Sequence, residues 1–130
     1  MVGRSIASVR LNEPCQWAFM FESGAGIGAE CPWRLLRGGR VAISSEDHLQ
    51  QYGLQAPLDA AIVATEMLSS RAVARVEVRY GTSDLFIEFT DEVLLEIVPF
   101  SSGYESWGVT SPSGFKVIAQ GGGQLCGWQS

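Results

Sequence analysis

Apolar and polar residues alternate with a period of two along both ends of this chain. The segment from Cys15 to Glu22 places Trp17, Phe19 and Phe21 on one side, and residues 73–80 alternate small or aromatic apolar residues with arginine and glutamate. Such alternation is typical of β-strands that bury one face. Further apolar runs lie between glycine, proline and serine turn signals. The pattern predicts strands over 6–11, 15–22, 27–36, 41–43, 73–80, 85–90, 93–98, 104–110, 115–120 and 124–128.

One segment near the middle has a helical period instead. Pro57 suits the first position of a helix, because its missing N–H is not needed there. Apolar residues then recur every three or four positions, and only Asp59 and Glu66 form a polar stripe. An apolar surface this wide predicts a mostly buried helix over 57–70, laid across a sheet.

The two strand-rich halves echo each other in sequence. Three short patterns occur once in each half: residues 9–11 with 76–78, residues 17–21 with 85–89, and the acid–tryptophan stretch 30–35 with 105–109. We therefore predict two antiparallel β-meanders, at about 5–44 and 73–128, related by approximate internal symmetry and bridged by the helix.

These elements predict a single α+β domain over residues 1–130, made mainly of antiparallel strands. A chain of 130 residues with 46% hydrophobic and 18% charged residues is typical of one globular domain. Because so many short strands need their edges covered, we expect closure into a barrel or a sheet strongly twisted around the helix.

Composition narrows the partners and the compartment. The net charge of −5 and the single lysine, Lys116, speak against a nucleic-acid-binding surface. The longest apolar run is shorter than the roughly 20 residues of a membrane-spanning helix. The three cysteines, Cys15, Cys31 and Cys126, are too few for a disulfide framework and lie in apolar runs, which favours buried free thiols. We therefore predict a cytoplasmic protein without a membrane or nucleic-acid partner.

His48 is the single histidine, and the acids Glu46 and Asp47 precede it. A zinc site needs three or four ligands, and the sequence has neither a second histidine nor C-x-x-C spacing. A nucleophile–base pair of Cys31 and His48 is conceivable, but nothing nearby activates the thiol and a core cysteine is favoured. We predict no metal, no cofactor and no catalytic residue, and a turn or cap role for the two acids.

The acid–tryptophan pair that occurs in both halves is the strongest candidate for a binding site. Alternate residues of a strand share a face, so Glu105 and Trp107 are expected to project together. Such a pair can anchor a ligand or partner. Alternatively, the tryptophans belong to the core and Glu105 bonds a turn or Arg34; the repetition favours this structural role. The candidate binding residues are Glu105, Trp107, Trp33, Arg34 and His48.

The last quarter of the chain carries a recognisable combination of motifs. Residues 104–107 read Y-E-S-W, P-S-G follows at 112–114, and residues 122–128 read G-G-Q-L-C-G-W. This combination resembles small uncharacterised bacterial proteins, some of which are similar to immunity proteins of polymorphic toxins. The resemblance implies a small α+β protein that binds another protein, and it implies no catalytic residues.

Two functional hypotheses follow. The first is a non-enzymatic protein-binding module, either an immunity-like inhibitor or a homodimer that uses an exposed strand edge. It is motivated by the acidity, the small size and the lack of a catalytic constellation. The alternative is a small-ligand-binding protein or minor enzyme with a pocket between the two meanders.

Overall fold

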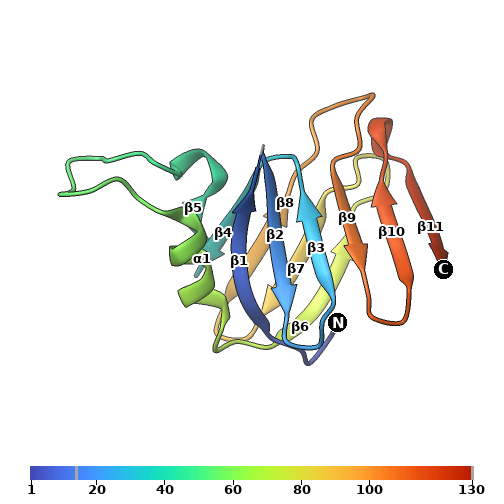
Figure 1. Cartoon of the computed structure of the whole chain (residues 1–130), viewed down its shortest axis with the longest axis horizontal. Helices are drawn as coiled ribbons and strands as arrows, with labels where there is room; N and C mark the ends of the chain where they lie inside the picture. The colour runs from blue at the N-terminus through green and yellow to red at the C-terminus, as the bar shows by residue number, and fades with distance from the viewer. Residues whose placement is uncertain (14, 130) are drawn as a thin grey trace.

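The protein is a sandwich of two antiparallel sheets with one helix along its side (Figure 1). The computed structural model describes residues 1–13 and 15–129. The six-stranded sheet has the order β1 (Ile6–Asn12), β2 (Gln16–Phe21), β3 (Gly26–Ala29), β9 (Trp107–Thr110), β10 (Phe115–Ala119) and β11 (Leu125–Gln129). The five-stranded sheet has the order β5 (Arg40–Ser44), β4 (Trp33–Arg37), β8 (Val93–Ile97), β7 (Leu85–Phe89) and β6 (Val73–Val78). The fold is α+β as predicted, and the sheets are not closed into a barrel.

The core lies between the two sheets, where the period-two pattern places its large apolar side chains. Trp17 and Phe19 of β2 meet Trp33 of β4 edge-to-face, with ring centroids 5.1 and 5.3 Å apart. Edge-to-face packing is a favourable arrangement for aromatic rings. The three rings join the two sheets near the end of the sandwich where the chain passes from β3 to β4.

Each half of the chain contributes strands to both sheets. Strands β1–β3 form a meander in the six-stranded sheet before the chain crosses to β4 and β5, whereas β6–β8 lie in the five-stranded sheet before the chain crosses to β9–β11. Each strand of the first half corresponds to the strand five numbers later, so that β1 corresponds to β6 and β5 to β10. When corresponding strands are exchanged, the order β1-β2-β3-β9-β10 becomes β6-β7-β8-β4-β5. That is the order of the other sheet. The strand topology therefore repeats, with β11 as an additional strand.

The prediction of one strand over 27–36 is wrong. This segment forms β3 and β4, which lie in different sheets, with Cys31 and Pro32 between them. Proline has no N–H for a strand ladder, and the carbonyl of Pro32 accepts a hydrogen bond from the N–H of Val98 over 2.9 Å. The proline therefore marks the place where the chain changes sheet.

The helix α1 (Ala60–Leu68) is shorter than the predicted 57–70. It begins after Asp59, whose backbone is extended and whose Oδ1 accepts the N–H groups of Ala61 and Ile62. An acidic N-cap of this kind satisfies otherwise unpaired backbone donors. The helix buries one stripe and leaves Ile62 57% exposed, so its burial is narrower than the sequence pattern predicts.

Helix α1 packs beside the edge strands β1 and β5 rather than across a sheet face (Figure 1). The Oγ1 of Thr65 accepts the N–H of Val9 over 2.9 Å. Its single hydroxyl proton can be donated to the carbonyl of Ala61, at 2.8 Å, or to that of Val9, at 3.3 Å. One helix side chain therefore satisfies the backbone of β1 at its outer edge, which protects that edge from pairing with another strand.

Candidate functional site

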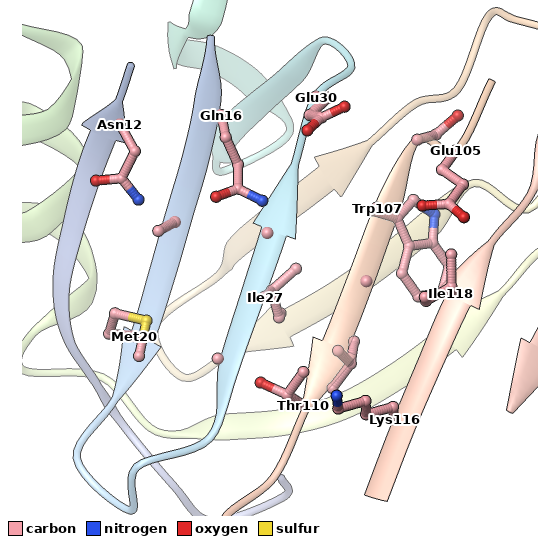
Figure 2. A pocket seen from close by; sticks show the side chains of 16 residues that line it. Asn12, Gln16, Met20, Ile27, Glu30, Glu105, Trp107, Thr110, Lys116 and Ile118 are labelled. Carbon is pink, nitrogen blue, oxygen red and sulfur yellow. The ribbon is translucent and has the colours of Figure 1, made fainter. Parts of the chain in front are cut away.

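A groove with a glycine floor crosses the outer face of the six-stranded sheet (Figure 2). The inner residues of β3 and β9, such as Ile27 and Trp107, belong to the core, so the alternate positions face outward. These positions include Gly26, Gly28 and Gly108, and Gly28 is the cross-strand partner of Gly108. Because the floor lacks side chains there, the sheet surface is hollowed over a volume of about 440 Å³.

Side chains of the neighbouring strands form the walls of this groove. Gln16 and Met20 of β2 lie on one side, and Lys116 and Ile118 of β10 lie on the other (Figure 2). The β2 side chains reach toward the floor: a Cβ on Gly28 would lie 2.8 Å from Nε2 of Gln16. The groove therefore combines a rigid backbone floor with walls of flexible side chains.

The two ends of the groove differ in charge. Glu30 follows β3 and Glu105 precedes β9, and the N–H of Glu30 donates to the carbonyl of Ser106 over 2.8 Å, which holds both carboxylates at the same end. Neither carboxylate forms an ion pair with another described residue. Lys116 lies beside Thr110 at the opposite end (Figure 2).

The two tryptophans, which were candidate binding residues but for which a core role was favoured, are buried in the core. Trp33 is 2% exposed in the five-stranded sheet and Trp107 is 3% exposed in the six-stranded sheet. Glu105 is exposed and precedes β9, so strand alternation does not apply to it, and the prediction that Glu105 and Trp107 project together is wrong. Trp107 supports the groove from below, whereas the side chain of Glu105 lies at its rim (Figure 2).

The structure places Arg34 and His48 away from this groove. Arg34 is on the outer side of β4, where its Nε donates to Oε1 of Glu96 on β8 over 2.6 Å, so Arg34 pairs with Glu96 rather than with Glu105. His48 accepts the N–H of Ala60 at its Nδ1 over 3.1 Å and therefore caps the start of α1. The five predicted residues do not form one site.

The predicted cap role of the acids before His48 is confirmed for Asp47. The 3₁₀ turn η1 (Ser45–Asp47) has a capping box, in which Oδ2 of Asp47 accepts the N–H of Ser44 over 3.0 Å. Asp47 also accepts the hydroxyl proton of Tyr52, and this hydrogen bond raises the pKa of Tyr52. These contacts make the segment a structural connection from β5 to α1.

A second groove, of about 680 Å³, lies between β1 and α1. His48, Asp59 and Thr65 are on its wall, but each already bonds the backbone of α1 or β1. The second groove also carries two carboxylates, Glu13 and Glu66, without an ion pair among the described residues. The glycine-floored groove differs from it in having a backbone floor and both of its carboxylates at one end, and for this reason it is the stronger candidate.

The predicted structural role of the glycines at 121–123 fits their surroundings. They form the 3₁₀ turn η2 (Gly121–Gly123) between β10 and β11, not a strand-to-helix phosphate loop. Gly123 has a φ of 81°, and a Cβ there would lie 1.9 Å from the carbonyl oxygen of Gly81. Glycine is therefore required where this turn meets the β6–β7 connection.

The cysteines have different surroundings. All three are free; Cys15 is exposed, contrary to prediction, whereas Cys31 and Cys126 are half-buried. Burial raises the pKa of the Cys31 thiol to about 12, with smaller contributions from the negative charges of Asp84 and Glu30. A thiol with so high a pKa is a poor nucleophile at neutral pH.

Sequence reasoning noticed Glu105 and its echo Glu30, but it missed the glycine floor. The signal was present, because Gly26-Ile27-Gly28 lies in an apolar stretch and Gly108 lies between Trp107 and Val109. Glycine inside a strand often marks a close approach of another molecule or backbone. Only the pairing of β3 with β9 brings the two glycine positions together.

Comparisons with known proteins add no assignment. The chain matches no protein-family model, no curated protein and no solved structure. The described residues contain no cluster of three or more His, Cys, Asp or Glu side chains arranged to hold a metal ion. Within the same part of the chain, no helix has the length and apolar character needed to cross a membrane. Of the C-terminal motif, the side chain of Trp128 lies outside the described residues.

Proposed function

We propose that this protein is a non-enzymatic protein-binding module, and that its partner docks in the glycine-floored groove. The observation that carries the proposal is the glycine floor at Gly26, Gly28 and Gly108, which ends at two carboxylates without an ion pair. The flexible side chains of Met20 and Gln16 lean over Gly26 and Gly28 and have to move aside when a partner docks. Once these two side chains move aside, a row of glycines in the middle of a sheet accommodates an extended chain or a long side chain from another protein.

The charges of the groove favour a basic group of the partner. The stem of a lysine or arginine side chain is apolar and packs well on a flat surface, while its charged end requires an anion. The floor is long enough to hold one such side chain. Gly26 and Glu30 are four strand residues apart, or about 13 Å at the usual rise, and an extended lysine or arginine side chain is shorter than this. We propose that an arginine or lysine of the partner lies along the floor, with its cation between Glu30 and Glu105. The net charge of −5 also attracts a basic partner.

The resemblance of the C-terminal motifs to immunity-type bacterial proteins supports the same class of function. An immunity-like protein of this kind would bind a basic surface of a toxin in the bacterial cytoplasm. Free cysteines fit a reducing compartment. The alternative, a small-ligand site between the two halves, is less well supported, because neither groove is lined by both Trp33 and Trp107.

Defined peptides test this proposal by NMR. The probe is the blocked peptide Gly-Val-Arg-Val-Gly, compared with the same peptide carrying citrulline, which has the shape of arginine without its charge. At low ionic strength we expect the arginine peptide to shift the amide resonances of Gly28 and Gly108 and to bind about two- to fivefold more tightly than the citrulline peptide, the range of exposed ion pairs.

Charge-matched variants provide the control. The double variant E30Q/E105Q should bind both peptides equally, whereas E22Q/E66Q removes the same number of exposed charges elsewhere and should keep the preference for arginine. Equal binding of the two peptides by the native protein, or shifts confined to residues outside the groove, would contradict the proposed partner chemistry.

A further inference from the structure

Strand β6 has a free outer edge. It is the last strand of the five-stranded sheet, and only its first residue is covered: Gly3 donates to the carbonyl of Val73, and the N–H of Val73 donates to the carbonyl of Arg4, each over 2.8 Å. No described residue bonds the outer edge beyond this point. Such an edge is a template for another strand.

The backbone groups on this edge can be assigned from the hydrogen bonds of the β6–β7 hairpin. Arg79 donates to the carbonyl of Asp84 over 2.8 Å and accepts from Ser83 over 2.9 Å, so both of its backbone groups face β7. Strand alternation then directs the N–H and C=O of Val78 and Val76 outward. Without a bulge, Val73 would face β7 like the other odd-numbered residues of β6. The bulge between Val73 and Arg75 reverses this alternation, so the backbone N–H and C=O of Val73 point outward, as their hydrogen bonds show.

The side chains of β6 form a self-complementary pattern. Arg75 and Glu77 lie on the outer face, form an ion pair with each other and are 59% and 56% exposed. Val76 lies on the inner face and packs against the core, and Val78 is 38% exposed. Antiparallel pairing of two copies about Val76 places Arg75 opposite the partner subunit's Glu77, and Glu77 opposite the partner subunit's Arg75.

The charges distinguish this register from the neighbouring one. Pairing about Glu77 would place that residue opposite the partner subunit's Glu77, and Arg75 opposite the partner subunit's Arg79. Like charges directly opposite each other destabilise a pair of strands. Pairing about Val76 also places Arg75 between Glu88, its cross-strand neighbour on β7, and a second carboxylate from the partner.

We propose that this protein forms a homodimer in which β6 pairs antiparallel with β6 of a second copy, about Val76. The two five-stranded sheets then form one continuous ten-stranded sheet. Val76 exchanges two backbone hydrogen bonds with its own counterpart, and the inner face of each β6 extends the apolar surface of the other. This interface is separate from the glycine-floored groove, which lies on the other sheet.

Charge reversal with sedimentation velocity tests both the dimer and its register. The native chain should show a concentration-dependent monomer–dimer equilibrium. The single variants R75E and E77R create like charges at two symmetric contacts and should raise the dimer dissociation constant about tenfold or more. The double variant R75E/E77R restores opposite charges between the subunits in the same register and should recover most of the affinity that the single variants lose, although the glutamate at position 75 then faces Glu88 on β7. These side chains are more than half exposed, and circular dichroism verifies that each variant folds.

Disulfide trapping measures the register directly. In the proposed dimer the two copies of Val76 have Cα atoms about 5.5 Å apart, within the range of a disulfide. V76C should therefore give a linked dimer under oxidation, and mass spectrometry should find the peptide that contains the substituted position joined to its own copy. A42C on the opposite edge strand β5 should give no such dimer. A chain that stays monomeric at all concentrations, or a dimer that the double reversal fails to restore, would overturn the proposal.

Discussion

The indole Nε1 of Trp107 donates a hydrogen bond to the backbone carbonyl of Ser83 over 2.8 Å. Trp107 begins β9 in the six-stranded sheet, whereas Ser83 lies in the β6–β7 turn of the five-stranded sheet and is 1% exposed. The bond therefore joins the two sheets beneath the glycine-floored groove. Trp33, the counterpart of Trp107 in the first half, is also buried, but its Nε1 has no hydrogen-bond partner among the described atoms.

This difference predicts unequal effects of the same substitution. W107F removes the donor and leaves a buried carbonyl unpaired, at a cost of about 1–3 kcal/mol in addition to the lost packing. W33F loses packing but also removes an unpaired buried N–H. We expect W107F to lower the free energy of unfolding in urea by more than W33F does, by about 1–3 kcal/mol. Equal losses would show that the bond to Ser83 contributes nothing.

Filling the groove floor should separate stability from binding. A Cβ on Gly108 would contact Ile118 and the carbonyl of Val117 at 3.6 Å, which is ordinary packing distance. Because glycine weakens a strand by about 0.5–1 kcal/mol relative to alanine, G108A should fold at least as stably as the native protein. The same variant should weaken binding of the arginine peptide. G127A changes a strand glycine outside the groove and should leave peptide binding unchanged.

Besides His48, a single carboxylate oxygen caps the start of α1. Oδ1 of Asp59 accepts from Ala61 over 3.0 Å and from Ile62 over 3.2 Å. D59A should lower the free energy of unfolding by about 0.5–2 kcal/mol, whereas D59N keeps an accepting oxygen and should cost much less. Chemical denaturation followed by circular dichroism measures both losses. A loss for D59N as large as that for D59A would indicate that charge, rather than the cap, stabilises the helix.

Cys31 should make stability depend on pH in the alkaline range. Burial raises its pKa in the folded protein from the ordinary 9.0 to about 12, so the folded state retains the proton that the unfolded state releases. This contribution to stability is fully present below pH 9 and is lost as the pH rises through 12. Unfolding experiments between these values should therefore show a decline that is smaller in C31A.

Cys15 and Cys31 should react with alkylating reagents at different rates, because, of the two, only Cys31 is partly buried. At about pH 8, iodoacetamide should modify the exposed Cys15 rapidly and Cys31 slowly, because the thiolate is the nucleophile. Peptide mass spectrometry over a time course measures each rate. Similar rates at both positions in the folded protein would contradict the burial of Cys31.

The sequence predicted most elements of this fold because their signals are local. Alternation in residues 85–89 and 93–97, with the Asp91-Glu92 turn between them, depends only on neighbouring residues. The helix was predicted too long, because apolar spacing continues past both ends while the cap at Asp59 decides the start. At the candidate site, Glu105 was identified because the sequence around it repeats the sequence around Glu30. The residues expected to line the same site, Trp33, Arg34 and His48, lie elsewhere.

The sequence by itself determined which segments are strands, where the chain turns, and that the two halves follow one pattern. Tertiary structure alone decided which sheet each strand joins, because a period of two defines a buried face but not the neighbour that covers it. The change of sheet at Pro32 and the pairing of β3 with β9 follow from contacts between residues far apart in the chain. Those contacts bury Trp33 and Trp107, and they bring Glu30, Glu105 and the glycine floor into one groove.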